Sequence, residues 1–318
     1  MADARFAPRQ RAGCIPWLHE RHLLKLQLGL EWFLNPDHLP MIAGVELGWY
    51  RDAGLSLELV VPDDHYDGLA ATVSGDIAFS CNEPLHMIDA PRPGLAALGC
   101  FFETDGGILL DRQAGRRLLE GGQVRLASPV AGGVTDAIAV EILARWCRQQ
   151  SASFEAGQVA IETAGFAHVQ NLQQGFDGAW LCFANFEGVE ARLLGLDTHF
   201  IATGDVGLRN FSALELFTSQ AFLEQHPEVV ERVVDLISRG ATLCREDPAH
   251  AARLWYAHSG EAPSPLMDAI IADTCPRLVS PVLRDVERWR GMWAQFDAMG
   301  LAQVDAEGYL ALYRSGGG

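Results

Sequence analysis

Trp32, Asn35 and His38 lie within seven residues of one another near the start of the sequence. An apolar stretch at residues 24–30 leads into them, and a helical pattern begins near Pro40. In open α/β sheets, ligands bind where a strand ends and feeds a helix. An indole, an amide and an imidazole at such a place could hold a flat polar ligand, so we predict that these three residues contact it. The alternative is a core tryptophan beside a turn that only caps the helix.

Asn82, Glu83 and His86 form a second polar group, directly after a short apolar stretch. Pro84 favours a helix start here, and we expect that helix to run to about Ala90. Asn82 and His86 are four residues apart, so one helical turn would bring both to one face. We predict that all three residues line the ligand site and that His86 is the candidate catalytic residue. Helix capping and an ordinary structural histidine are the alternatives.

Ser128 and Thr135 flank a glycine-containing turn between a predicted strand and a predicted long helix. Free amides at a helix start bind anions such as carboxylate, sulfonate or phosphate. No lysine follows the glycines, so this is not a nucleotide phosphate loop. We predict a ligand contact at Ser128 and Thr135, with ordinary capping as the alternative.

Trp180, Asn185 and Glu187 repeat the arrangement of the opening group, with an aromatic strand end before a helix start. A ring of pyrimidine size could stack between Trp32 and an aromatic side chain of this segment, while acidic groups bind its amines. We therefore predict ligand contacts at these three residues. Core aromatics and a capping asparagine are the alternative.

Two acidic segments are further candidates. Glu103, at the end of an apolar strand, could accept hydrogen bonds from an exocyclic amine. Asp64, His65 and Asp67 could ligate a divalent metal, because imidazole and carboxylate suit such ions. We predict ligand contacts for His65 and Glu103, and we leave the identity of any metal open. Solvated loop acids are the alternative for both segments.

Composition limits the classes of partner. The chain has 318 residues, 49% of them hydrophobic, and a formal net charge of −17. Such an acidic chain lacks the basic patch that binds nucleic acid, and no apolar run is long enough to insert into a membrane. The seven cysteines are odd in number and no secretory signal is visible, so we expect a reduced, cytoplasmic protein. The expected partner is a small-molecule ligand, and a homodimer stays open.

Strand and helix patterns alternate through residue 110 and again from about 112 to 205. This alternation predicts two α/β units with parallel sheets. From Ser219 the pattern is helical to the end of the chain, with no strand expected there.

Several segments carry a resemblance to the thiamine-pyrimidine-synthase-like family of the type II periplasmic-binding-protein fold. They are residues 28–40, residues 46–59, Gly75-Asp-Ile-Ala-Phe, Leu172-Gln-Gln-Gly-Phe-Asp-Gly-Ala and Phe222-Leu-Glu-Gln-His-Pro-Glu-Val-Val. The resemblance implies two lobes with a ligand cleft between them and extra C-terminal helices. Lobe one would comprise residues 1–108 and 206–318, and lobe two residues 109–205, with hinge closure around the ligand.

The resemblance also implies three candidate functions. The first is binding of a small planar amine-bearing heterocycle, such as a thiamine pyrimidine precursor. The second is an enzyme similar to the thiamine pyrimidine (HMP-P) synthase, with His86 at the position of the histidine that those enzymes consume, and with iron. Asn82 stands at the position of their lysine and cannot form a Schiff base with pyridoxal phosphate, and their cysteine run is missing near residues 210–214. The third is binding of alkylsulfonate-type anions, for which arginine is scarce in the candidate loops.

Overall fold

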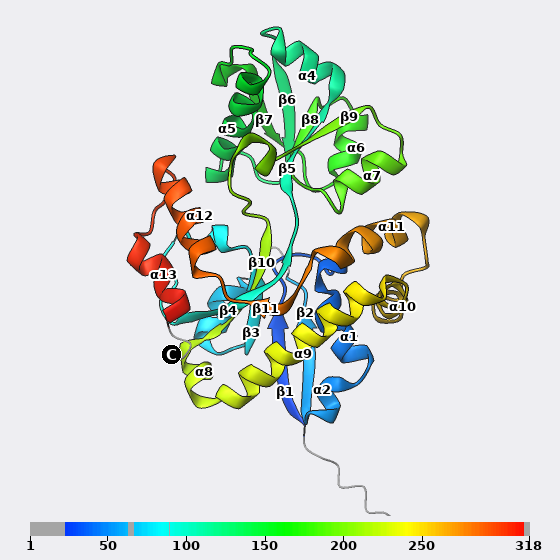
Figure 1. Cartoon of the computed structure of the whole chain (residues 1–318), viewed down its shortest axis with the longest axis vertical. Coiled ribbons are helices and arrows are strands. Elements are labelled where there is room, and N and C mark those ends of the chain that lie inside the picture. The colour runs from blue at the N-terminus through cyan, green and yellow to red at the C-terminus, as the bar shows by residue number, and fades with distance from the viewer. Residues whose placement is uncertain (1–22, 63–66, 89, 315–318) are drawn as a thin grey trace, which may run out of the picture.

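The computed structural model describes residues 23–62, 67–88 and 90–314. These residues form two α/β lobes, one above the other in Figure 1, each built around its own sheet. One sheet has six strands in the order β11-β4-β10-β3-β1-β2, and the other has five in the order β7-β6-β8-β5-β9. The predicted α/β class is confirmed.

The six-stranded sheet takes strands from both ends of the chain. They are β1 (Leu24–Gly29), β2 (Leu55–Val60), β3 (Phe79–Asn82), β4 (Leu95–Glu103), β10 (Ala213–Ser219) and β11 (Leu278–Leu283). β1 is parallel to β2 and β3, but β10 is antiparallel to β3 and β4, and β11 is antiparallel to β4. The sheet is therefore mixed. The expectation of a parallel sheet followed only by helices is wrong, because the returning chain inserts β10 between β3 and β4.

The five-stranded sheet uses only the middle of the chain. Its strands are β5 (Gly106–Asp111), β6 (Val124–Ser128), β7 (Val159–Thr163), β8 (Gly178–Phe183) and β9 (Thr198–Ala202). Its helices are α4 (Arg112–Leu119), α5 (Val134–Gln149), α6 (His168–Gln173) and α7 (Glu187–Leu193). β6 is parallel to β7 and β8, whereas β5 is antiparallel to β8 and β9.

The remaining helices pack around the six-stranded sheet. They are α1 (Leu39–Glu46), α2 (Trp49–Asp52), α3 (Gly68–Ser74), α8 (Gln220–Gln225), α9 (Pro227–Glu246), α10 (Pro248–Ser259), α11 (Pro265–Thr274), α12 (Val286–Ala298) and α13 (Ala306–Arg314). The helical pattern that begins near Pro40 forms two helices, α1 and α2, divided at Gly48, whose φ of 74° is left-handed and favours glycine. α9 crosses α1 closely at Gly240, where a Cβ atom would lie 2.1 Å from the Pro40 carbonyl oxygen.

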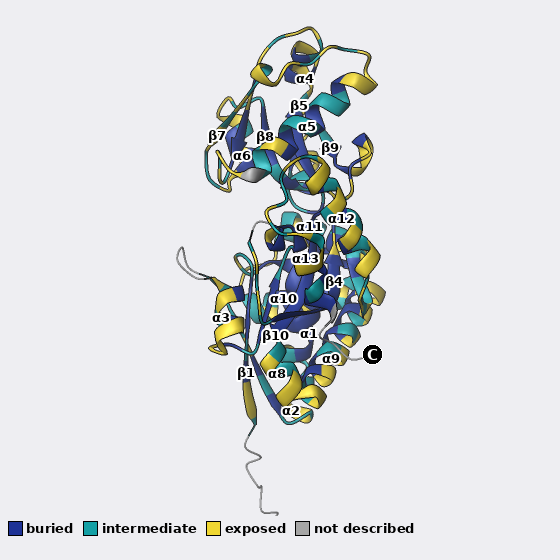
Figure 2. Cartoon of the chain, turned by 90° about the vertical axis from the view of Figure 1, so that its left-hand side faces the viewer, coloured by how far each residue is buried: buried dark blue, intermediate teal, exposed yellow. Residues whose placement is uncertain are grey.

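Figure 2 shows buried residues along the strands and exposed residues on the outer helix faces, as expected for two sheets covered by amphipathic helices. Two connections join the sheets, at residues 104–105 between β4 and β5 and at residues 203–212 between β9 and β10. The lobe boundaries at 108/109 and 205/206 stay a prediction. Among the described helices, none is both long and apolar enough to cross a membrane.

Candidate functional site

A cavity of about 490 Å³ lies between the two sheets. This volume is in the range of small-molecule sites. Its aromatic lining comes from both sheets and comprises Trp32, Phe33, Phe102, Phe166, Phe183 and Phe186. Its acidic lining comprises Glu31, Asp37, Asp67, Glu83 and Glu187. A ligand here would meet ring faces and carboxylates together.

Trp32 connects the lobes at the cavity. Its ring centroid lies 4.5 Å from that of Phe166, which follows β7, and 4.5 Å from that of Phe33. Trp32 is half-buried, while Phe33 and Phe166 are 45% and 53% exposed. Aromatic faces near a cavity mouth can stack on a flat ring. The structure thus places Trp32 where its predicted ligand contact requires it.

Asn35 lines the cavity, but its side chain also has a structural role. Its Oδ1 accepts the amide N–H of Asp37 at 2.9 Å, which caps the short turn Pro36–His38. Its Nδ2 donates to the Phe33 carbonyl at 3.1 Å. The capping alternative is therefore present in the structure, and a ligand contact at Asn35 stays a prediction.

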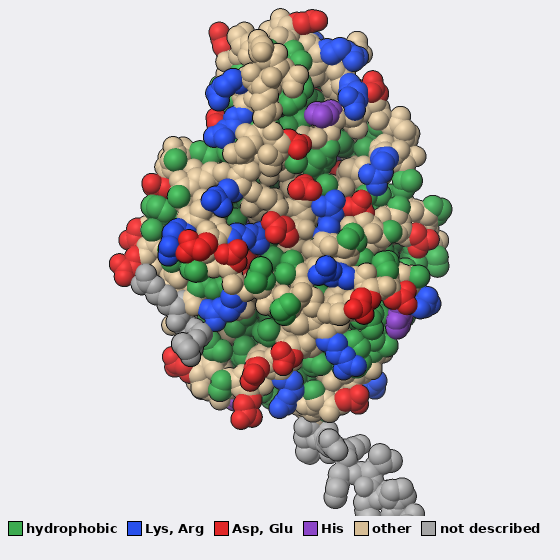
Figure 3. Space-filling model, in the orientation of Figure 1, with side chains coloured by type: hydrophobic (Ala, Val, Ile, Leu, Met, Phe, Trp, Pro, Cys, Tyr) green, Lys and Arg blue, Asp and Glu red, His purple; other side chains and the backbone are tan. Residues whose placement is uncertain are grey.

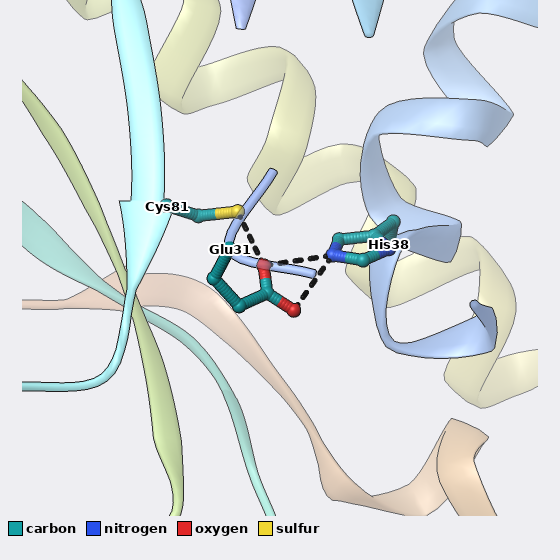
Figure 4. Close-up of side chains that lie close together, drawn as sticks. All are labelled: Glu31, His38 and Cys81. Atoms are coloured by element: carbon teal, nitrogen blue, oxygen red, sulfur yellow. Dashed lines mark hydrogen bonds and ion pairs between the residues drawn. The ribbon is translucent and has the colours of Figure 1, made fainter. Parts of the chain in front are cut away.

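Glu31 is held by two buried side chains (Figure 4). His38 Nε2 lies 3.0 Å from Glu31 Oε2, and the Cys81 thiol donates to the same oxygen at 3.0 Å. Burial alone would raise the pKa of Glu31, but His38 and the Cys81 hydrogen bond outweigh it and hold that pKa below its usual value. Glu31 and Cys81 line the cavity, whereas His38 is fully buried behind Glu31. His38 therefore positions Glu31 and does not reach the ligand space itself, which corrects its predicted contact.

These three side chains form a donor set that divalent metals accept, with their ligand atoms within 4.8 Å of one another. However, His38 Nδ1 accepts the Asn35 amide N–H at 3.2 Å, so the imidazole proton sits on Nε2 and points at Glu31. A metal at Nε2 would have to displace that proton and break the bond from Asn35. The hydrogen bonds among Glu31, His38, Cys81 and Asn35 account for the arrangement of the cluster.

Asn185 is buried outside the cavity, in a network that bridges the lobes. Its Nδ2 donates to Asp37 Oδ1 at 2.8 Å and to Thr274 Oγ1 at 2.9 Å, and its Oδ1 accepts from Thr104 Oγ1 at 2.8 Å. Burial raises the pKa of Asp37 to about 8, against the opposing effect of His38. The predicted ligand contact at Asn185 is corrected to a role in joining the lobes, while Asp37 itself lines the cavity.

Glu187 starts α7 and lines the cavity. Its Oε2 accepts the Phe183 amide N–H at 2.8 Å. Burial raises the pKa of Glu187 to about 7, so this carboxyl can switch between neutral and charged near neutral pH. Its position agrees with the predicted contact to a ligand amine.

Asn82, Glu83 and His86 all line the cavity, although the helix expected through residue 90 is only a short 3₁₀ turn, Pro84–Met87. Asn82 ends β3, and its Oδ1 accepts the Glu83 amide N–H at 2.8 Å. His86 Nε2 lies 3.5 Å from Glu83 Oε2, and its side chain is 48% exposed. The structure brings the three residues to one wall, where the role of each toward a ligand stays a prediction.

Besides His38 and Asn185, four more predicted residues do not border the cavity. Trp180 is fully buried in the core, where its ring centroid lies 6.0 Å from that of Phe211. Leu181 and Phe183, nearer the end of β8 and past a register shift in that strand, line the cavity instead. Glu103 accepts from Asn210 Nδ2 at 3.1 Å and lies 3.3 Å from Arg288. Ser128 is buried and bonds the backbone of Val130, and Thr135 lies in the first turn of α5. Trp180 is thus a core residue, while the ligand contacts of Glu103, Ser128 and Thr135 stay predictions that the cavity lining does not support.

Some predicted residues fall outside the described ranges, and some lining residues were missed. Asp64 and His65 lie among residues 63–66, outside the described part of the chain, while Asp67 caps α3 through the amide N–H groups of Leu69 and Ala70. Lining residues that were not predicted include Glu31, Asp37, Arg92, Phe102 and Phe166. Phe166 lies three residues after the end of β7, and this position near a strand end is the signal that could have found it.

The structure also bears on pyridoxal phosphate. Lys25 is the only lysine in the sequence, and it is exposed near the start of β1. β1 leads to the cavity only at its other end, through Leu30 and Glu31. A lysine Schiff base in this cavity therefore does not fit the residues present.

The two-sheet architecture is that of a periplasmic-binding-protein fold. The structure superposes on the alkanesulfonate-binding protein SsuA from Xanthomonas axonopodis pv. citri, solved bound to MOPS, with a TM-score of 0.62 over 88% of this chain and 94% of that chain. Sequence identity to it is 14%, so this likeness concerns the fold. The predicted two-lobe fold is confirmed.

The chain belongs to the NMT1/THI5-like family. The family model, described as "NMT1/THI5 like", matches residues 35–97 and 131–251, together more than half of the chain. The chain is similar to a 4-amino-5-hydroxymethyl-2-methylpyrimidine phosphate synthase of Legionella pneumophila, with 23% identity over 83% of each chain. It is also similar to a formylaminopyrimidine-binding protein of Halalkalibacterium halodurans, with 20% identity over 86% of this chain and 84% of that one.

Proposed function

We propose that the chain binds a small planar amine-bearing heterocycle, of the thiamine pyrimidine precursor type, in the cavity between the sheets. The observation that carries the proposal is the joint lining of the cavity by aromatic rings and carboxylates. Rings such as Trp32 and Phe166 can stack on a pyrimidine. Carboxylates such as Glu31 and Glu187 can accept hydrogen bonds from its amines. The names of both relatives refer to a pyrimidine compound, which supports the same ligand class.

Two measurements test the proposal. Native mass spectrometry of freshly purified protein would reveal a retained small molecule, and calorimetric titration with 4-amino-5-hydroxymethyl-2-methylpyrimidine would give its Kd. Trp32→Ala should weaken binding by about ten-fold, a loss of about 1.4 kcal/mol, because one stacking face is removed. Trp49→Phe is the matched control, since Trp49 is also half-buried but stacks on Arg239 away from the cavity. Equal affinity of the wild type and the Trp32 variant would contradict the proposal.

The second candidate is an enzyme similar to the pyrimidine phosphate synthase, using His86 and iron. The similarity to the Legionella protein over 83% of each chain favours it, and half-exposed His86 lines the cavity. Incubation with iron(II), air and pyridoxal phosphate, followed by mass analysis of the peptide that contains His86, separates the two candidates. A change in the mass of this peptide would favour the enzyme, and an unchanged peptide would favour the binding protein.

A further inference from the structure

β8 departs from regular strand geometry at Leu181. β5 pairs Gly107 with Cys182 and Ile108 with Trp180, so Leu181 is an extra residue without a partner across the ladder. An extra residue in one strand of a pair defines a β-bulge. The φ angle of Leu181 is 61°, in the left-handed region that residues other than glycine seldom adopt.

This backbone conformation has no explanation from a helix end. Of the described residues other than glycine, only Ser151 shares a positive φ, and Ser151 follows the end of α5, where a left-handed residue is common. Leu181 lies inside a strand, where the same conformation brings its Cβ close to the following carbonyl oxygen. Strained positions of this kind persist where the surrounding structure holds them, and they gather at ligand sites.

The bulge changes which side chains of β8 reach the cavity. Ala179 and Cys182 pack on the side of the sheet covered by α6 and α7, whereas Trp180 and Leu181 pack on the side covered by α5. In a regular strand, Leu181 would face the same side as Ala179, and Cys182 would face the same side as Trp180. The bulge therefore moves Leu181 to the side of Trp180 but nearer the strand end, where it lines the cavity with Phe183.

Leu181 adds an aliphatic surface to a cavity that also contains carboxylates. Glu31, Asp37 and Glu187 line the same space, and a hydrogen-bonding edge of a ligand ring would meet them. Leu181 is only half-buried, so part of its apolar surface is left uncovered. An apolar substituent on the ligand ring would bury that surface, which is favourable.

We infer that Leu181 is a specificity-determining residue that contacts an apolar substituent of the bound heterocycle, so that the site prefers a ring carrying a methyl-sized group to the same ring without it. This inference rests on the proposed function and narrows its ligand class. The contact is separate from stacking on Trp32 and from hydrogen bonds to the carboxylates.

The test compares 4-amino-5-hydroxymethyl-2-methylpyrimidine with 4-amino-5-hydroxymethylpyrimidine, which lacks the ring methyl, by calorimetry. The wild type should bind the methylated compound about ten-fold more tightly, as one carbon in an apolar pocket allows. Leu181→Ala should reduce this ratio to about three-fold or less, because most of the aliphatic surface is removed. Leu172→Ala is the matched control and should leave the ratio unchanged, since Leu172 is also a half-buried leucine of the same lobe but does not line the cavity.

Two further variants separate the contact from folding. Leu181→Asn keeps a branched side chain that tolerates the left-handed conformation but is polar, so it should also reduce the ratio to about three-fold or less. Leu181→Gly should have a higher Tm than Leu181→Ala, because glycine adopts a positive φ without strain. Leu172 lies in α6, so Leu172→Gly should instead have a lower Tm than Leu172→Ala.

The outcomes distinguish the inference from the proposed function. A reduced ratio in both Leu181→Ala and Leu181→Asn, with an unchanged ratio in Leu172→Ala, supports the inference. Pyrimidine binding without a preference for the methyl group in the wild type, or with the same preference in the two Leu181 variants, overturns the inference while the proposed function survives. A lower Tm for Leu181→Gly than for Leu181→Ala also overturns it, because the strained bulge would be absent. If neither pyrimidine binds the wild type, the proposed function fails and the inference fails with it.

Discussion

The side-chain amide of Asn185 donates to the Asp37 carboxylate at 2.8 Å and thereby joins the two lobes beside the cavity. Asn185 is fully buried, and both Nδ2 hydrogens and Oδ1 have partners, including Thr104 at the connection between the sheets. Trp32 and Phe166 make a second contact across the same gap. The two lobes are therefore joined by specific side-chain contacts and not only by the two chain connections.

Asn185→Ala should weaken this contact between the lobes. It leaves the buried hydroxyls of Thr104 and Thr274 without their amide partner, which costs about 2 kcal/mol of unfolding free energy. Urea unfolding measures that loss, and small-angle scattering should show a larger radius of gyration. The exposed amide of Gln225 provides the control variant Gln225→Ala, which should change neither quantity. An unchanged scattering curve for Asn185→Ala would argue against its role in joining the lobes.

His168 should make stability depend on acid pH. It is buried, both ring nitrogens lack hydrogen-bond partners in the described structure, and burial lowers its pKa to about 4. The unfolded chain takes up a proton near pH 6.5, but the folded protein does so only near pH 4, so stability falls as pH drops through this window. His168→Leu should remove this contribution and raise Tm more at pH 5.5 than at pH 7.5. Exposed His226→Leu should give no such difference, and equal Tm changes at both pH values for His168→Leu would refute the assignment.

Glu187 should make the binding of cations depend on pH near neutrality. Its pKa is raised to about 7 by burial, so the carboxyl becomes charged as pH rises from 6 to 8. The affinity for benzamidine, a planar cation that stays protonated in this range, should therefore increase with pH. Asp37, raised to about 8, contributes in the same direction. Calorimetry of Glu187→Gln should show a flatter pH profile than the wild type, and an identical profile would show that Glu187 does not face the ligand.

The stability of the protein should depend on the hydrogen bonds that the C-terminal helices α12 and α13 donate to Glu215. It is buried in β10 and accepts hydrogen bonds from Trp289 Nε1 at 3.0 Å and from Tyr313 Oη at 2.6 Å. Tyr313→Phe should cost about 2 kcal/mol, because a buried carboxylate loses a donor. Tyr256→Phe is the control, since Tyr256 Oη donates to Asp268 at 2.7 Å at an exposed site and should cost less than about 1 kcal/mol. Equal losses of unfolding free energy in urea would show that burial of Glu215 does not matter.

The α/β fold class could be predicted from local sequence patterns, but the strands β10 and β11 could not. β10 carries Glu215 inside an otherwise apolar segment, and the donors that satisfy it come from α12 and α13, far along the chain. β11 contains Pro281, a residue that disfavours strands and is confined to positions such as sheet edges. Both strands depend on tertiary partners that a local pattern does not contain.

Residues of the candidate site could be predicted from the sequence when their place beside a strand end was enough to bring them to the cavity. Trp32 and Glu187 border the cavity for this reason. Trp180 does not, because it lies in the core three residues before the end of β8, whereas Phe183 at that end lines the cavity. The buried pairing of His38 with Glu31 depends on side-chain geometry that residue spacing cannot show. The face in Figure 3 mixes acidic and basic side chains without a broad basic patch, in keeping with the acidic composition.

A crystal structure of the protein with 4-amino-5-hydroxymethyl-2-methylpyrimidine tests the central claim most directly. The account predicts the ring stacked on Trp32 inside the cavity, with an amine within hydrogen-bond distance of Glu31 or Glu187. A pyrimidine found outside the cavity, or inside it with no carboxylate near its amines, would contradict the account.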